Sequence, residues 1–246
     1  MKLRICSATD EVNDMIIKLI QTQRSDPLYQ KVRDTHYIAN RQMMGRQIHY
    51  LIYIDNIFSG IISGSSPISY AKKYDLVFGV HNVDYRINEI VDNSVFALIN
   101  NVHNAGSAVL SEWRYRTFID WKEKYGYEIK GYVTKCFGDN REGTIYKADN
   151  WTHLGLSSGI AFATLGTSDP IQAKKNAEKL IAEYPSQFFS IRDIGLNRRF
   201  TKNKKDNTYI AHFNAPKKHM YAKKLTGKEI NRYNVWSSEQ RSSVNQ

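Results

Sequence analysis

An acid and a tyrosine lie close together in the sequence, where they could exchange a proton with a substrate. Residues 132–137 are rich in β-branched and aromatic side chains, which predicts a strand, and Asp139 follows its end. Residues 142–149 then have the apolar spacing of a short helix, which carries Tyr146. Open α/β sheets bind substrates beyond such strand ends, so both side chains are candidate catalytic residues. The alternative is a Gly/Asn/Asp-rich turn with an aromatic residue in the core.

A second candidate is the loop that precedes the helix predicted at residues 108–125. Its small residues leave backbone N–H groups open at the start of a helix, which favours anions, so a phosphate could bind there. The chain has no G-x-G-x-x-G pattern and no Walker lysine, and an ordinary capped helix is the alternative. The candidate cofactor-binding residues are Asn104, Ala105, Gly106 and Ser107.

His36 and Tyr37 form a third candidate pair, in a polar stretch that spans residues 21–40. The chain has 7 histidines, and no two of them lie four residues apart, so spacing alone does not define a metal site. A metal site that forms only in the folded chain stays open, for instance from His36 and Asp139. The alternative for the His-Tyr pair is a structural or exposed position.

The positive charge of the chain is concentrated in its last third. The net charge is +11, yet residues 1–170 contain 19 Lys and Arg against 18 Asp and Glu, whereas residues 171–246 contain 16 against 6. Such a field favours a polyanionic partner, because neutralised phosphates supply most non-specific affinity for nucleic acids. Interleaved aromatic side chains would suit base stacking, and a solvated basic surface is the alternative. The basic residues expected to contact nucleic acid are Arg198, Arg199, Lys202, Lys204, Lys205, Lys217 and Lys218.

Composition narrows the class of protein further. No run of eighteen apolar residues exists that could span a membrane, and the acids Asp10, Glu11 and Asp14 argue against a secretory signal. Cys6 and Cys136 have no metal-ligand spacing and are expected to be reduced thiols. We therefore expect a cytoplasmic protein that does not act at a membrane.

The apolar patterns predict an α+β protein with a mixed central sheet and few helices. Strands are expected at residues 3–8, 48–54, 57–63, 75–80, 93–100, 132–137, 208–214 and 219–225. Helices are expected at residues 10–20, 108–125, 142–149 and 170–184. Asp55-Asn56 between two apolar runs indicates a hairpin turn. Residues 21–40 are expected to be a polar connection, and the polar residues 231–246 a flexible tail.

Several of these segments together resemble GNAT-like proteins related to bacteriophage Mom, and are also similar to the Druantia-type DruA domain. The segments that carry the likeness are His36-Tyr37, residues 45–52, Gly60, residues 63–66, residues 93–99, Ala105-Gly106-Ser107, Asp120-Trp121 and residues 137–155. The most specific piece is the pattern Gly-x-Ile-Tyr-x-Ala-x-Asn-Trp-x-x-x-Gly after the acid. Mom proteins modify DNA, and DruA-type proteins occur in bacterial anti-phage systems.

The resemblance implies a GNAT-like (acyl-CoA N-acyltransferase-like) domain at residues 1–230 with a basic part at about 171–230. It implies an enzyme that adds a carbamoylmethyl (acetamido-type) group to N6 of adenine in DNA, in a phage anti-restriction setting. Acetyl-CoA or a related acyl-CoA would bind at the split of the sheet, and a metal ion is a further option. A homodimer is one option for its assembly.

Carried over residue by residue, the resemblance assigns the family's acid to Asp139 and its helical tyrosine to Tyr146. His36 and Tyr37 match the N-terminal His-Tyr pair, and residues 104–107 match the phosphate loop. This loop lacks the usual Gln/Arg-x-x-Gly-x-Gly/Ala form. Two alternatives stay open: a GNAT-type N-acyltransferase that acts on a protein or RNA amine, and a catalytically inert DNA-binding accessory of a defence or transposition system.

Overall fold

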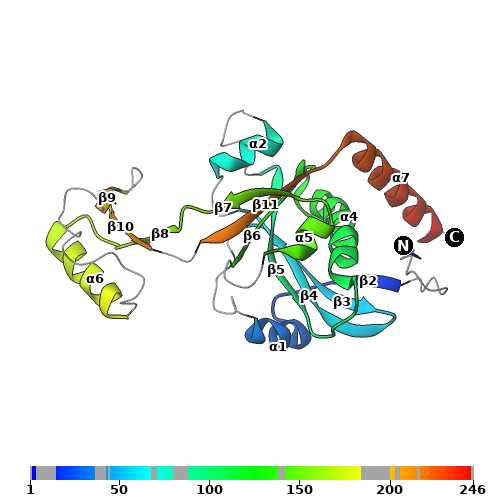
Figure 1. The fold of residues 1–246 in the computed structure, drawn as a ribbon, viewed down its shortest axis with the longest axis horizontal. Coiled ribbons are helices and arrows are strands. Elements are labelled where there is room, and N and C mark those ends of the chain that lie inside the picture. Colours follow the sequence, from blue (N-terminus) through cyan, green and yellow to red (C-terminus); the bar gives the residue numbers. More distant parts are fainter. Residues whose placement is uncertain are drawn as a thin grey trace. The chain divides into compact units, whose positions relative to one another are not determined.

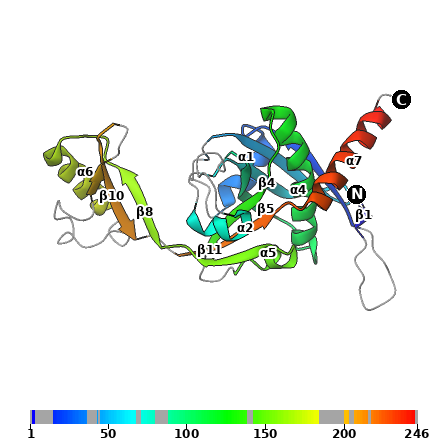
Figure 2. The same ribbon diagram turned by 90° about the horizontal axis from the view of Figure 1, so that it is seen from above.

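The computed structural model divides the chain into two compact units (Figures 1 and 2). The core unit comprises Met1–Cys136, Gly143–Gly155 and Met220–Gln246, and the inserted unit comprises Phe137–Glu142 and Leu156–His219. The expected single domain at 1–230 is thus interrupted by a second unit. The structure describes residues 2–3, 15–36, 43, 45–67, 71–79, 88–137, 142–183, 200–202, 206–214 and 217–244.

The core unit is built on an eight-stranded mixed sheet with the strand order β1-β2-β3-β4-β5-β6-β11-β7 (Figure 1). Its strands are β1 (Lys2–Leu3), β2 (Met15–Thr22), β3 (Gln47–Ile54), β4 (Ile57–Ser65), β5 (Ile90–Leu98), β6 (Gly131–Phe137), β7 (Thr152–Leu156) and β11 (Lys218–Lys224). Strands β2 to β5 form an antiparallel meander, and β6 pairs parallel to β5. A mixed sheet with flanking helices confirms the predicted α+β class with a mixed central sheet.

The helices of the core unit cover both faces of this sheet. They are α1 (Pro27–Thr35), the 3₁₀ turn η1 (Lys72–Tyr74), α2 (Asp75–Phe78), α4 (Ala105–Tyr125), α5 (Thr144–Ala148) and α7 (Gly227–Val244). In β3, Tyr50 and Ile52 pack in the cluster that contains α4, whereas Leu51 packs in the cluster that contains α1. Because side chains alternate between the faces of a strand, α1 and α4 lie on opposite faces.

The inserted unit has its own small sheet and helix. Its strands β8 (Ile160–Thr164), β9 (Phe200–Lys202) and β10 (Tyr209–Asn214) form an antiparallel sheet in the order β8-β10-β9. Helix α6 (Pro170–Glu183) packs Ala173 and Ala177 against Leu165 and Ala211. The unit therefore buries apolar surface within itself, in line with the predicted helix and strand at residues 170–184 and 208–214.

Strands β5 and β6 separate where the candidate residues begin. Their parallel pairing covers Ile90↔Gly131 to Asp92↔Val133, after which β5 continues to Leu98 and β6 to Phe137. At the same point, the register between β4 and β5 shifts. This is the split in the sheet that the resemblance implied, and α4 forms the connection between its two strands.

Three predicted elements are wrong, and all three depended on ambiguous periodicity. The helix expected at 10–20 is in its described part the strand β2, in which Met15, Ile17 and Leu19 alternate with exposed side chains. Both periods fit so short an apolar run, and the neighbouring β3 decides in favour of the strand. The strand expected at 75–80 contains the short helix α2 instead. The polar connection at 21–40 contains α1, whose start is capped by the Asp26 carboxylate.

The flexible tail expected from residue 231 is also wrong, since helix α7 continues to Val244. Tyr233 is almost fully buried and contacts the rings of Tyr115 and Phe118 on α4. The polar composition of residues 231–246 suggested a frayed end, but packing of α7 against α4 stabilises this helix. By contrast, the Asp55-Asn56 hairpin, α4, β6 and α5 are confirmed close to their predicted positions.

Candidate functional site

A buried polar network lies at the point where β5 and β6 separate. The Tyr146 hydroxyl donates to Oδ1 of Asn93 at 2.7 Å and lies 3.4 Å from the hydroxyl of Thr134. The Thr134 hydroxyl also donates to the Asn93 carbonyl at 3.0 Å. The tyrosine ring stacks on Tyr221, with 5.5 Å between centroids, and meets Trp151 edge-on. Tyr146 from α5 is therefore held against both diverging strands.

The network continues across the sheet through Ser63. Asn93 donates its amide to the Ser63 carbonyl at 3.3 Å. The Ser63 hydroxyl lies 2.7 Å from the Tyr29 hydroxyl and 2.9 Å from Nδ1 of His49. Burial lowers the pKa of His49 to about 4, and the neighbouring cations add to this shift. The imidazole is therefore neutral at physiological pH and can take part in hydrogen bonds without a buried charge.

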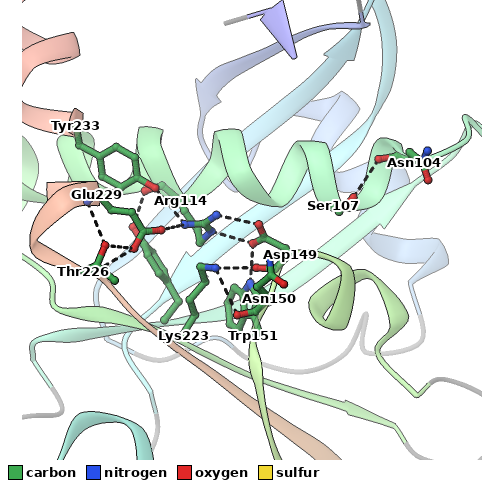
Figure 3. Close-up of polar contacts among 11 residues, drawn as sticks. Asn104, Ser107, Arg114, Asp149, Asn150, Trp151, Lys223, Thr226, Glu229 and Tyr233 are labelled. Carbon is green, nitrogen blue, oxygen red and sulfur yellow. Dashed lines mark hydrogen bonds and ion pairs between the residues drawn. The ribbon is translucent and has the colours of Figure 1, made fainter. Parts of the chain in front are cut away.

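The start of helix α4 lies directly beside α5. Asn104 has a left-handed backbone with φ of 59° and makes no side-chain cap, while the Ser107 hydroxyl donates to the Asn104 carbonyl (Figure 3). Among the described residues, no acceptor binds the backbone N–H of Gly106 or Ser107. A Cβ atom on Gly106 would lie 2.6 Å from Cγ2 of Ile145. A glycine is needed here because α4 and α5 approach each other so closely.

A buried cluster of charges fixes the other end of α5 (Figure 3). The guanidinium of Arg114 donates two hydrogen bonds of 2.8 Å to the carboxylate of Asp149, and one of 3.0 Å to Glu229. The Trp151 indole also donates to Asp149 at 2.7 Å, and the Lys223 ammonium donates to the Asp149 carbonyl at 2.7 Å. Burial opposes the charge of Arg114, but the bonds to Asp149 outweigh it and raise the pKa.

This cluster was not predicted as a functional feature of the chain. Trp151 is a fixed position of the most specific sequence pattern and Asp149 a variable one, and the partner of Asp149, Arg114, lies 35 residues away on α4. The signal that could have found it was the buried arginine among the apolar residues of α4. The cluster connects α4, the end of α5, β11 and α7, and so determines where Tyr146 lies.

The predicted site residues are only partly described. Helix α5, which carries Tyr146, lies next to the predicted cofactor loop, because its residue Ile145 contacts Gly106. Nε2 of His36 lies 3.2 Å from the Phe96 carbonyl, a contact in which this nitrogen carries the proton and cannot bind a metal. No group of three potential metal ligands is found among the described residues. The site predictions that lie outside the described residues are Tyr37 and Asp139.

Most of the residues predicted to contact nucleic acid also lie outside the part of the chain that the structure describes. Lys202 ends strand β9, Lys217 is exposed, and Lys218 begins β11. The other four lie outside the described residues: Arg198, Arg199, Lys204 and Lys205. No helix in the described part of the chain is both long and apolar enough to cross a membrane.

The fold defines an α+β protein whose mixed central sheet splits between β5 and β6. The model of the family Druantia protein DruA matches residues 4–162, and the chain belongs to this family. The likeness to Mom proteins stays a resemblance of sequence motifs. No significant match is found among proteins with curated descriptions.

Several solved structures are distantly similar. An acetyltransferase from Salmonella typhimurium that modifies the N-terminal serine of ribosomal protein L7/L12 is 12% identical, with a TM-score of 0.36, and the match covers 74% of this chain and 66% of that one. Campylobacter jejuni N-acetyltransferase PseH, in complex with acetyl coenzyme A, is 11% identical, with a TM-score of 0.34 and coverage of 81% and 99%. FeeM, an N-acyl amino acid synthase from uncultured soil microbes, is 11% identical, with a TM-score of 0.38 and coverage of 85% and 89%. The chain thus spans just under two thirds of the first of these structures.

Proposed function

We propose that this protein is an acyl-CoA-dependent transferase that places a small acyl-derived group on N6 of adenine in DNA. The observation that carries the proposal is the meeting of two features. The open start of α4, with the amides of Gly106 and Ser107, lies beside α5, which holds Tyr146 at the sheet split. A donor with a phosphate-bearing handle could be bound at the first feature and reach the second.

The start of α4 fits the phosphates of coenzyme A. Two unbonded N–H groups and the positive end of a helix of 21 residues both favour an anion. The side chain of Asn104 does not cap the helix, so it leaves these groups open. The bound donor would supply an activated acyl group. The chain would bind the donor through residues 104–107.

The residues at the split would orient the reacting groups. An exocyclic adenine amine is a poor nucleophile, because its lone pair is delocalised, so orientation and proton transfer must lower the barrier. In this proposal, Asp139 orients the amine or accepts its proton, and the Tyr146 hydroxyl turns its one proton from Asn93 Oδ1 to the negative charge that develops at the donor. Asn93 and Thr134 hold the Tyr146 hydroxyl in position. His36 and Tyr37 stay predicted participants.

DNA is proposed as the acceptor because of the positive charge of the chain. The last 76 residues carry most of the net positive charge, which suits the phosphate backbone of DNA. A protein or RNA amine is the alternative acceptor, and a DNA-binding protein without chemistry is the alternative class. These alternatives differ from the proposal in their products and in their binding of CoA.

The test combines donor binding with product analysis for three proteins: wild type, Ser107→Glu and Ser107→Ala. A glutamate in the first turn of α4 favours the helix but repels phosphates, so we expect unchanged or higher thermal stability and CoA binding weakened by about tenfold or more. The alanine variant keeps the backbone N–H and loses the same hydroxyl, and it should bind CoA as wild type does. Calorimetric titration measures the affinity.

Products are identified by mass spectrometry of nucleosides from the DNA of expressing cells. A mass-shifted deoxyadenosine with wild type and Ser107→Ala, reduced with Ser107→Glu, is the expected result. Unmodified DNA together with acylated protein or RNA would assign the alternative acceptor. If wild type binds no CoA, or Ser107→Glu binds it as tightly as wild type, the proposed donor site is wrong.

A further inference from the structure

The long segment of the inserted unit, Leu156–His219, begins and ends next to two residues that are hydrogen-bonded to each other. The N–H of Ser157 donates to the Lys218 carbonyl at 2.8 Å, and the N–H of Lys218 donates to the Ser157 hydroxyl at 3.0 Å. These bonds join the two ends of a segment of about sixty residues. Adjacent ends are typical of a segment that is inserted into another unit.

The inserted unit also has its own core and a helix with one free face. Ala173 and Ala177 of α6 are buried against Leu165 and Ala211, as the small side chains allow close packing on β10. The opposite face of α6 is exposed and carries Lys174, Lys175 and Lys179, with the acid Glu178 among them, so this face has an excess of positive charge. The carboxylate of Asp169 caps the start of the helix by accepting from Ile171 and Gln172, so the basic face, and not the helix end, is available to anions.

The inserted unit has a larger excess of basic over acidic residues, for its length, than the core unit. Its two segments, Phe137–Glu142 and Leu156–His219, together contain 12 Lys and Arg against 7 Asp and Glu. In the core unit, exposed lysines form ion pairs such as Lys122–Glu128 and Lys130–Glu89. None of the three exposed α6 lysines takes part in an ion pair with a described residue. Their charge is therefore open to a partner.

We propose that the inserted unit is a nucleic-acid-binding module that holds duplex DNA through the exposed lysine face of α6. The choice of DNA, rather than another polyanion, rests on the proposed function. Lys174, Lys175 and Lys179 lie within six residues on one helix. They span about 8 Å along its axis, which is roughly the rise of two nucleotides along a DNA strand. The core unit binds the donor, and the inserted unit supplies the affinity for the substrate.

Charge removal at matched positions tests this proposal in the full-length protein. One triple variant changes Lys174, Lys175 and Lys179 to Gln, and a control changes the exposed core lysines Lys18, Lys31 and Lys228 to Gln, so both lose the same net charge. Binding of a fluorescently labelled DNA duplex is measured as a function of salt. For the α6 variant, we expect the dissociation constant to rise about tenfold or more and the salt slope to fall by roughly two to three, at ~0.9 per lost phosphate contact.

The control variant should keep the wild-type affinity and salt slope, and both variants should bind CoA as wild type does. An equal loss of DNA binding in the two variants would overturn the proposal, because the overall charge would then hold the DNA. Wild type that binds anionic lipid vesicles or an acidic protein but no duplex would also overturn it. DNA binding that depends on the α6 lysines without adenine modification would support the module and contradict only the proposed function.

Discussion

At the scale of single residues, the candidate site is defined by the hydrogen bond between Tyr146 and Asn93. Tyr146 could be selected from the sequence, since it lies in a specific pattern after a predicted strand. Asn93 could not, because its contact with Tyr146 joins residues 53 positions apart. Its role depends on the separation of β5 from β6, which no local pattern contains. Asp139, the other residue selected at this turn, stays a prediction.

His49 should make the stability of the protein depend on pH. Its pKa is about 4 in the folded chain because of burial, against about 6.5 when unfolded. Between these values the unfolded chain binds a proton that the folded chain excludes. The contribution of His49 to the free energy of unfolding is therefore complete above about pH 6.5. As the pH drops from about 6.5 towards 4, the free energy of unfolding should fall by up to about 1.4 kcal/mol per pH unit.

Urea unfolding at a series of pH values measures this dependence. The variant His49→Gln keeps a hydrogen-bonding side chain near Ser63 but does not titrate. Its unfolding free energy should change less between pH 6.5 and 4 than that of wild type, while other titrating groups contribute equally to both. Parallel pH profiles for the two proteins would show that His49 is not the group responsible.

At the scale of elements, the position of α5 depends on helices that are distant in sequence. Arg114 of α4 binds Asp149 at the end of α5, and it also binds Glu229 and Tyr233 of α7. The C-terminal helix therefore has a structural role in holding the candidate site. The sequence predicted α4 and α5 from their apolar spacing, but it predicted a tail in place of α7, whose order comes from contacts with α4.

Removal of one partner from the buried Arg114–Asp149 pair should destabilise the protein far more than removal of one partner from an exposed ion pair. Both side chains are less than a tenth exposed, and Asp149→Asn would leave the buried guanidinium without its bidentate partner. We expect a loss of about 3–5 kcal/mol in the free energy of unfolding. Removal of the exposed Lys122–Glu128 pair by Glu128→Gln should cost no more than about 1 kcal/mol. Chemical denaturation compares the variants, and equal costs would contradict a dominant role for the buried cluster.

At the scale of the whole molecule, the chain combines a core unit with an inserted unit that interrupts it between β7 and β11. The family match ends at residue 162, close to the point where the inserted unit begins. The sequence showed the concentration of positive charge in the last third. It did not show that much of this charge belongs to a separate unit with its own core.

Removal of the inserted segment should leave the core unit folded. Replacing residues 158–217 with two glycines would connect Ser157 and Lys218, which already bond to each other. We expect cooperative unfolding and wild-type affinity for CoA, since the sheet and the start of α4 keep their contacts. Circular dichroism, urea unfolding and calorimetric titration check this. A soluble wild type beside an aggregated or non-cooperative deletion variant would show that the core depends on the inserted segment.

The sequence by itself determined the elements whose signals are local. The Asp55-Asn56 turn, the long helix that ends at Gly126, and the short helix with Tyr146 each follow from residues a few positions apart. Tertiary structure alone decided that residues 15–22 form a strand, because the edge of β3 offers hydrogen bonds that a lone apolar run cannot specify. It also decided the partners of Arg114 and Asn93, since polar groups buried from water must bond wherever the packed fold places an acceptor.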